Sequence, residues 1–376
     1  MRRLTVVQLL PALEAGGVER STLEIAQALV RAGHRAIVVS NGGRLLARLE
    51  ALGAEHVTLD IGRKSPLTFR HVPALRRLFR EVDADIVHAR SRLPAWLALF
   101  ALRGMRGRTP PAPVPRFVTT AHGLNSPSRY SGVMTRGERV ICVSGCVRDH
   151  LLRQYPRTDP RRLVVIPRGV DPRAFPRAPM PDRAARARVA AADPRLNGDG
   201  PLLLMPGRGT RLKGHADAIA LLANLRASGI DARLWMPGAL QDGREAYLAE
   251  HKDLAQAAGV EDAVAITDTS DDIAGAYAAS NLVLQLSRKP ESFGRTVIEA
   301  LSVGRPVLGW AHGGVGELLQ ALQPAGAVAP FDKAALASAA CNLLAHPPVP
   351  AATMQAYRLD AMQEATLALY QSLVDA

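Results

Sequence analysis

The chain has few cysteines and no long apolar run. Three cysteines in 376 residues form neither a disulfide framework nor a metal-ligand pattern, which favours a reducing compartment. The longest apolar stretch, residues 93–102, has about half the length that a helix needs to cross a bilayer. We therefore expect a cytoplasmic protein without a transmembrane helix.

Aromatic residues are also scarce, at 4% of the chain, and no known nucleic-acid recognition module is present. Proteins that bind single strands or bases commonly stack aromatic rings on them. We therefore expect no nucleic-acid partner, despite a net charge of +13.

Acidic residues are outnumbered only in the first half of the chain. Residues 1–178 contain 30 Lys+Arg against 13 Asp+Glu, whereas residues 179–376 contain 17 against 21. The basic half is either a solvated face or a surface that attracts an anionic acceptor or an anionic membrane leaflet, and the sequence leaves both open.

The apolar residues, 48% of the chain, form short β-type runs that alternate with longer helical segments. This alternation predicts parallel sheets with helices on both faces. The strands predicted in the first half are residues 4–10, 35–40, 56–60, 85–90, 116–121, 139–144 and 162–167. The helices predicted between them are residues 18–31, 67–82, 92–104 and 145–154.

Four prolines in residues 172–183 interrupt the pattern and predict a linker, after which the alternation restarts. The later predicted strands are residues 201–207, 232–238, 263–267, 281–286 and 306–310. The later predicted helices are residues 213–227, 243–258, 271–279, 296–303 and 332–345. The chain is therefore predicted to be an α/β protein with two doubly wound domains, residues 1–175 and 176–357. Ligands of such domains bind outside the carboxyl ends of the strands, here in a cleft between the two domains.

Two glutamates eight residues apart are the most informative polar residues. Glu291 lies in a turn rich in Pro, Ser and Gly, and Glu299 lies inside the predicted helix 296–303. Each carboxylate accepts several strong hydrogen bonds. Such a pair can therefore hold two parts of one polyhydroxylated ligand.

Arg208 and Lys213 lie together in the loop after the first strand of the second half. With the flexible Gly209 between them, both can reach one diphosphate, Arg as a planar fork and Lys as a point charge. The lysine stands out because the chain contains only five. The order of residues is not that of a P-loop.

Gly16, Gly17 and His122 follow strands of the first half. The two glycines precede a helix, where they allow close approach of a ligand and leave N–H groups for an anion, although a plain turn explains them equally well. His122 ends the strand 116–121 beside Gly123. A lone histidine is more often structural than catalytic, but this one lies at the ligand-binding end of a strand.

Two other motifs could suggest a dinucleotide site or a metal site, and the sequence argues against both. A glycine-rich turn at residues 310–318 carries Glu317, but neither half has G-x-G-x-x-G after its first strand, which excludes a dinucleotide fingerprint. Asp83 and Asp85 form a D-x-D pair, the pattern that holds a metal in some transferases. Because they precede the strand 85–90, we expect them to cap its start rather than bind metal.

The chain resembles, over nearly its full length, the retaining glycosyltransferases of family 4, which have the GT-B fold of two Rossmann-like domains. The motifs that carry this resemblance are Gly16-Gly17, residues 120–123, VIPRGVD (165–171), Arg208 with Lys213, and PESFGRTVIEALSVGRPV (290–307). Arg168 stands where the family usually has Asn.

The resemblance implies a role for each candidate residue. Arg208 and Lys213 would hold the donor diphosphate together with the Gly16-Gly17 turn. Glu291 would contact the transferred sugar and Glu299 the ribose hydroxyls, and His122 would touch the sugar from the opposing domain. The backbone would approach the sugar and phosphates at Ser292, Phe293 and Gly294.

The activity implied is that of a hexosyltransferase that needs no metal or cofactor. It would move a hexose from a nucleotide-diphosphate sugar, UDP-linked, to a cell-surface glycan such as lipopolysaccharide core or O-antigen, free or lipid-linked. The first domain would bind the acceptor and the second the donor. A final helix, residues 358–376, would pack back on the first domain, whose basic surface would contact the anionic leaflet of the inner membrane. A nucleotide-sugar epimerase or a glycan phosphorylase of the same fold is the alternative.

Overall fold

The structure is a computed structural model that describes residues 2–14, 16–106, 114–241, 243–348 and 354–375. The chain divides into two compact units. Unit 1 comprises Met1–Arg168 with Leu359–Ala376, and unit 2 comprises Gly169–Arg358.

Unit 1 contains a seven-stranded parallel sheet with the order β3-β2-β1-β4-β5-β6-β7. Its strands are β1 (Thr5–Leu9), β2 (Arg35–Ser40), β3 (Glu55–Thr58), β4 (Ile86–Ala89), β5 (Arg116–Ala121), β6 (Arg139–Cys142) and β7 (Leu163–Val165). Its α-helices are α1 (Gly17–Arg31), α2 (Leu46–Ala51), α3 (Val72–Glu81), α4 (Arg92–Arg103), α5 (Gly145–Gln154) and α13 (Leu359–Val374). Its 3₁₀ helices are η1 (Pro66–His71), η2 (Ser131–Thr135) and η3 (Pro160–Arg162).

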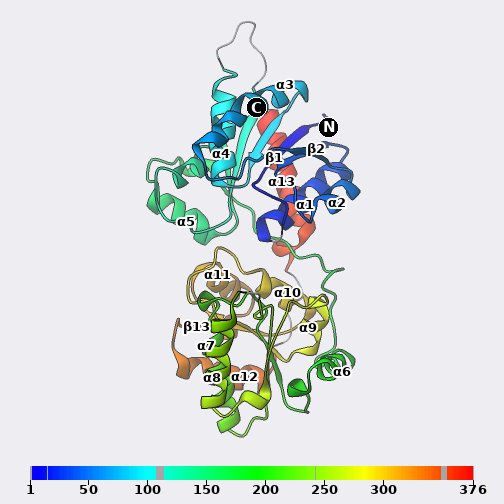
Figure 1. The fold of residues 1–376 in the computed structure, drawn as a ribbon, viewed down its shortest axis with the longest axis vertical. Coiled ribbons are helices and arrows are strands. Elements are labelled where there is room, and N and C mark those ends of the chain that lie inside the picture. The colour runs from blue at the N-terminus through cyan, green and yellow to red at the C-terminus, as the bar shows by residue number, and fades with distance from the viewer. Residues whose placement is uncertain (1, 15, 107–113, 242, 349–353, 376) are drawn as a thin grey trace. The chain divides into compact units, whose positions relative to one another are not determined.

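Both faces of this sheet are covered, as the near-continuous apolar strands require. Side chains alternate between faces along a strand. Val6 therefore packs in one core cluster with residues of α1 and α13, whereas its neighbour Val7 packs in another with residues of α3 and α4. Helices α1 and α13 lie side by side, although they come from opposite ends of the chain (Figure 1).

Unit 2 contains a six-stranded parallel sheet with the order β10-β9-β8-β11-β12-β13. Its strands are β8 (Leu202–Leu204), β9 (Arg233–Pro237), β10 (Val264–Thr267), β11 (Leu282–Gln285), β12 (Val307–Trp310) and β13 (Ala327–Val328). Its α-helices are α6 (Arg183–Ala192), α7 (His215–Ala227), α8 (Glu245–Ala257), α9 (Ile273–Ala279), α10 (Arg295–Val303), α11 (Gly313–Leu322) and α12 (Lys333–Ala345). Its 3₁₀ helices are η4 (Pro194–Leu196), η5 (Arg211–Lys213), η6 (Glu261–Ala263), η7 (Pro324–Gly326) and η8 (Gln355–Tyr357). The prediction of two doubly wound α/β domains is thus confirmed.

One predicted helix was wrong. The single helix predicted over residues 67–82 is a 3₁₀ helix, η1, followed by α3, because Pro66 and Pro73 each suit a first helical turn and divide the segment. The segment 172–183, predicted to be a linker, forms no helix or strand before α6 begins at Arg183, and it is held against unit 2. The buried Arg305 side chain donates to the carbonyl oxygens of Ala178 and Ala278, at 3.1 and 2.6 Å.

None of the helices in the described part of the chain combines the length and the apolar character that crossing a membrane requires.

Candidate functional site

Lys213 and Glu291 form an ion pair, with 2.6 Å between Lys213 Nζ and Glu291 Oε1. Lys213 comes from the segment after β8, and Glu291 comes from the segment after β11. These two strands are neighbours at the point where the strand order of unit 2 reverses. Ligands of open α/β sheets bind beyond the strand ends at this switch point. The structure therefore brings the predicted cationic loop and the first predicted glutamate together.

Two further residues hold the Glu291 carboxylate. Ser287 donates to Oε1, the oxygen that Lys213 contacts, and Gln285 Nε2 donates to Oε2 at 3.4 Å. His312 Nε2 lies 2.8 Å from the Ser287 carbonyl oxygen. These supporting residues were not predicted from the sequence. Their only signal is their position at the end of a buried strand, β11.

The segment 310–318, predicted to be a turn, contains the start of α11. Its glycines permit close packing of this helix against the Glu291 loop. A Cβ on Gly313 would lie 2.5 Å from the Glu291 carbonyl oxygen, and one on Gly314 would lie 2.5 Å from Phe293 Cα. Gly314 N also donates to the Glu291 carbonyl at 2.7 Å. Gly314 is required by this packing, and Gly313 is required both by the packing and by its φ of +59°. Glu317 lies on the same helix, α11.

Two helices begin at this site and a third contacts it. α7 follows Lys213 directly, α10 follows Gly294, and the first turn of α11 packs on the Glu291 loop. Helix N-termini carry partial positive charge and favour anions. Arg208 is exposed in the same loop as Lys213, and its guanidinium has no hydrogen-bond or ion-pair partner among the described residues. The site therefore presents two cations and several helix N-termini to one region.

The other predicted donor residues are positioned by α10. Glu299 is buried on this helix, with 7% of its surface exposed, and accepts a hydrogen bond from Tyr277 of α9 at 3.1 Å. Ser292, Phe293 and Gly294 form the turn from Glu291 into α10, where Gly294 has φ +123°. Glycine is required there by the backbone itself.

A second ion pair lies beside the site and was not predicted. Arg288 donates to both carboxylate oxygens of the buried Asp217, at 2.9 and 2.8 Å, and stacks 5.1 Å from the Phe331 ring centre. Asp217 lies in the first turn of α7. The pair thus ties the segment after β11 to the helix that follows Lys213.

In unit 1, His122 is held by Arg168. Arg168 Nη2 lies 2.6 Å from His122 Nδ1, and Arg168 Nη1 donates to Ser21 Oγ at 2.7 Å. A guanidinium can only donate hydrogen bonds, so His122 Nδ1 accepts and the neutral ring carries its proton on Nε2. The residue that departs from the family pattern therefore sets the tautomer of a predicted site residue.

A buried polar network lies deeper in unit 1. His88 lies 2.6 Å from the Tyr370 hydroxyl through Nδ1 and 2.7 Å from Thr120 Oγ1 through Nε2. Burial, helped by the charges of Arg90 and Arg168, holds the pKa of His88 well below its ordinary value. Burial likewise raises the pKa of Tyr370 to about 12. His88 is therefore a neutral structural histidine.

The remaining predicted residues of unit 1 lie at the start of α1. Gly16 is the N-cap of this helix, and a Cβ on it would meet the end of the Glu19 side chain. A Cβ on Gly17 would meet nothing within 4 Å, and the same holds for Gly123. The fold alone does not require glycine at these two positions, so the space there is open to a ligand.

Asp85 caps a strand start, as expected from the sequence. It accepts hydrogen bonds from Thr5 N at 2.8 Å and Arg2 Nη2 at 2.6 Å. Within the described ranges, no group of three or more His, Cys, Asp or Glu side chains is arranged to hold a metal.

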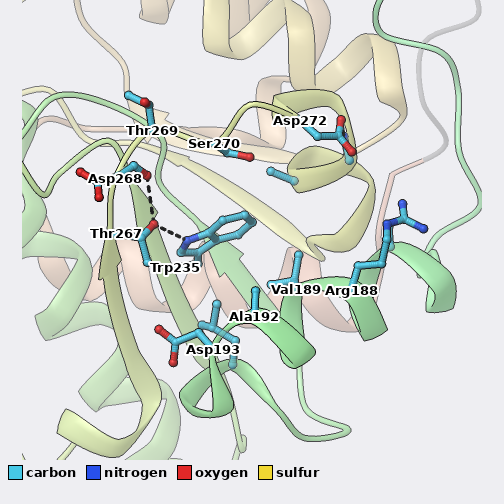
Figure 2. Close-up of a pocket in the computed structure, with 14 residues that line it drawn as sticks. Arg188, Val189, Ala192, Asp193, Trp235, Thr267, Asp268, Thr269, Ser270 and Asp272 are labelled. Carbon is cyan, nitrogen blue, oxygen red and sulfur yellow. Dashed lines mark hydrogen bonds between the residues drawn. The ribbon is translucent and has the colours of Figure 1, made fainter.

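Unit 2 also contains a cavity of 490 Å³ between α6, α9 and the sheet. Trp235 lies in its wall and donates to Thr267 Oγ1 at 2.9 Å, with Val189 and Ala192 of α6 opposite (Figure 2). None of the predicted site residues lines this cavity. Its rim residue Thr269 lies next to Gly238, which in turn adjoins Gly207 of the cationic loop. The cavity is thus adjacent to the Lys213 loop but distinct from the Lys213–Glu291 pair.

Comparison with known proteins identifies the family of the chain. The family model "Glycosyltransferase Family 4" matches residues 15–174, and "Glycosyl transferases group 1" matches residues 189–358. The chain belongs to the family 4 glycosyltransferases. It is a hexosyltransferase with the GT-B fold, as the sequence motifs predicted.

Relatives of this glycosyltransferase support the assignment. A D-inositol 3-phosphate glycosyltransferase of Frankia alni is 28% identical over 72% of this chain and 76% of its own. A glycosyltransferase of Rickettsia africae has a solved structure that is 26% identical, covers 100% of this chain and 99% of its own, and has a TM-score of 0.87.

Two more distant solved structures share the fold of this glycosyltransferase. Anabaena HepE, solved with UDP and glucose, is 19% identical, with 98% of this chain and 100% of its own covered and a TM-score of 0.79. WaaG, a glycosyltransferase involved in lipopolysaccharide biosynthesis, is 19% identical, with 98% of each chain covered and a TM-score of 0.66.

Proposed function

We propose that this glycosyltransferase moves a hexose, with retention of anomeric configuration, from a UDP-linked sugar to a cell-surface glycan acceptor of the lipopolysaccharide type. The observation that carries the proposal is the Lys213–Glu291 pair at the switch point of unit 2. UDP as the donor nucleotide is supported by the UDP found in the similar fold of HepE. The lipopolysaccharide-type acceptor is supported by the similar fold of WaaG and by the excess of basic residues in the first half of the chain.

The opposite charges of the pair fit a nucleotide-sugar donor. Its diphosphate is negative and suits Lys213, and its sugar is rich in hydroxyls and suits Glu291. Without donor, Lys213 and Glu291 neutralise each other. In the proposed complex, the ammonium of Lys213 and the guanidinium of Arg208 turn to the diphosphate, and the Glu291 carboxylate accepts hydrogen bonds from sugar hydroxyls. Preorganised cations and helix N-termini stabilise the charge that develops on the leaving diphosphate.

The reaction proposed needs no metal ion or cofactor. The acceptor hydroxyl attacks the anomeric carbon, the bond from that carbon to the diphosphate breaks, and the hydroxyl proton passes to a diphosphate oxygen. In the same proposal, His122 contacts the transferred sugar, Glu299 the ribose, and the Gly16-Gly17 turn the diphosphate. The enzyme would act in the cytoplasm.

Transfer assays on purified protein test the proposal. UDP, GDP and ADP sugars are compared as donors in thermal-shift binding assays, and UDP release is then measured with and without a lipopolysaccharide-core acceptor. Lys213→Ala is expected to lower kcat by 10²- to 10³-fold, because loss of one preorganised charge at a transition state has about this effect. Lys252→Ala, at an exposed lysine of α8, is the matched control.

Different results would redirect or reject the proposal. UDP release that needs acceptor supports transfer, whereas conversion of the donor sugar without acceptor indicates an epimerase, and phosphate-dependent release of sugar from a glycan indicates a phosphorylase. If Lys213→Ala kept the wild-type kcat, the assignment of Lys213 to the donor site would be wrong. Inversion of the anomeric configuration in the product, measured by NMR coupling at the anomeric position, would reject retention. Loss of activity in EDTA would reject a reaction that needs no metal ion.

A further inference from the structure

Phe331 is an exposed aromatic residue in a backbone conformation that suits few side chains. It lies in the connection from β13 to α12 and is 47% exposed. No other Phe, Trp or Tyr in the described part of unit 2 is as exposed. Its φ of +69° lies in the left-handed region, which costs a bulky residue free energy that Gly or Asn would largely avoid. Strain of this kind at an exposed position favours a functional reason for the residue.

Three neighbours hold the Phe331 ring. Arg288 lies over it, with the guanidinium carbon 5.1 Å from the ring centre. The His312 ring meets it edge to face at 6.0 Å, and the buried Trp310 ring lies 5.8 Å away. The ring is therefore fixed in place, and its exposed part is a preformed apolar surface.

Arg288 keeps hydrogen-bond donors free beside this ring. Its Nη1 donates to Asp217. Its Nε and Nη2 have no hydrogen-bond or ion-pair partner among the residues that the structure describes, and its side chain is exposed. Arg288 N also donates to the Leu212 carbonyl oxygen at 2.7 Å, and Leu212 is 50% exposed. Two exposed apolar side chains, Leu212 and Phe331, therefore adjoin an arginine with free donors.

These three residues, Leu212, Arg288 and Phe331, which we call the Phe331 surface, lie at the same sheet edge as the Lys213–Glu291 pair. Leu212 precedes Lys213, and Arg288 lies in the segment from β11 to Glu291. Phe331 follows β13, two strands beyond β11 in the sheet. Since neighbouring strands are about 4.8 Å apart, the ends of β11 and β13 are about 10 Å apart. A ligand group on the Phe331 surface therefore lies beside the proposed site of the transferred sugar, and not at it.

The Phe331 surface fits the chemistry of a sugar ring. The C–H groups on one face of a hexose pack on apolar and aromatic surface, and the hydroxyls lie around its rim. Hydroxyl oxygens accept hydrogen bonds, and the free Nε and Nη2 of a guanidinium supply two of them as a planar fork. An arginine beside an exposed aromatic ring thus offers contacts to both parts of a sugar.

We propose that the Phe331 surface is a subsite for a sugar of the acceptor that does not itself react. The acceptor class that it selects is an oligosaccharide, long enough for one sugar to lie on Phe331 while another is glycosylated. This inference rests on the glycan acceptor proposed above. It adds a requirement for acceptor length and a part for unit 2 in binding the acceptor.

Acceptors of two lengths test the inference on the full chain. The probes are the lipopolysaccharide-core oligosaccharide, freed of lipid, and a methyl glycoside of its terminal sugar. The wild type should have a lower KM for the oligosaccharide. Phe331→Asn should raise this KM about three- to tenfold, because about half of the side chain is left for a sugar to cover. The kcat for the oligosaccharide should stay the same, since the ring binds ground state and transition state alike. The short glycoside should not respond to the substitution.

The choice of substitutions separates binding from folding. Asn tolerates the left-handed conformation, so Phe331→Asn should unfold at the urea concentration of the wild type or above it. A purely structural Phe331 would instead make the variant less stable and less active with both acceptors. Phe331→Trp keeps an aromatic ring and should keep the low KM. Arg288→Lys keeps a cation for Asp217 but lacks the fork, and it should raise KM for the oligosaccharide about threefold.

Saturation-transfer NMR gives a readout that does not depend on transfer of the hexose. With wild-type protein, the C–H protons of one sugar within the oligosaccharide should be saturated from aromatic protons, and Phe331→Asn should remove this signal. The matched control is Leu254→Asn, at a leucine of α8 that is 40% exposed. It should change neither this signal nor KM.

The possible failures are distinguishable. If wild type and Phe331→Asn have the same KM for the oligosaccharide, the inference is overturned while the proposed transfer stands. If neither the oligosaccharide nor the glycoside accepts a hexose, the acceptor proposed above is rejected, and the inference is rejected with it. If Phe331→Asn converts a dimer to a monomer in sedimentation velocity, the Phe331 surface is an interface between copies and the inference also fails.

Discussion

Acid should destabilise unit 2 through His215, the buried first residue of α7. Its Nδ1 lies 2.7 Å from the Tyr247 hydroxyl, and its ring centre lies 5.9 Å from that of His251. Burial, with smaller contributions from the charges of His251 and Lys213, lowers the pKa of His215 from 6.5 to about 4. Because the folded state resists protonation, the unfolded state binds more protons between these two values, and the free energy of unfolding falls as the pH falls through this window.

The size of the effect follows from the shift. One pKa unit corresponds to about 1.4 kcal/mol, so His215 alone should remove about 2 kcal/mol of stability between pH 7 and pH 5 and about 3 kcal/mol by pH 4. His215→Asn keeps a hydrogen-bonding group for Tyr247 but cannot titrate. The difference between wild type and this variant therefore isolates His215 from the other histidines.

Urea unfolding at pH 7 and pH 5, followed by tryptophan fluorescence, measures this difference. Trp96 is replaced by Phe in both proteins, so that the remaining tryptophans, Trp235 and Trp310, report unit 2. Wild type should lose about 2 kcal/mol more than His215→Asn between the two pH values. Parallel pH dependence in the two proteins would refute the reasoning.

Two further substitutions test the packing and the tautomer described above. Gly314→Ala should destabilise unit 2 by about 1–3 kcal/mol and raise KM for the donor, because the added methyl group overlaps Phe293. Unchanged urea unfolding and donor titration would show that the close approach is not needed. Arg168→Asn should release His122 Nδ1, so that ¹⁵N NMR of the ring shows both tautomers instead of Nε2–H alone. A single Nε2–H tautomer in the variant would mean that Arg168 does not set it.

The elements of the sheets could be predicted because their strands are buried on both faces and read as continuous apolar runs. The strands β2 and β5 have the predicted bounds, residues 35–40 and 116–121. The failures have physical causes. α2 spans only six residues, which is too short for a clear period, and the glycines that begin α11 favour a turn unless the loop they pack against is known.

The candidate residues could be predicted from their type and position, whereas their assembly around one donor was expected only from the family resemblance. Lys213 and Glu291 stood out by residue type and by position after strands. Their contact depends on β8 and β11 being neighbours, and the order of strands in a sheet cannot be read from order along the chain. The role of Arg168 could not be predicted for the same reason, since its hydrogen-bond partner Ser21 lies 147 residues away in the sequence.

The C-terminal helix α13 has a consequence for synthesis of the protein. Met362, Leu369, Tyr370 and Leu373 of this helix belong to a core cluster of unit 1. The ribosome releases these residues only after all of unit 2 has been translated. Unit 1 therefore waits, with only part of this face of its sheet covered by α1, until α13 emerges.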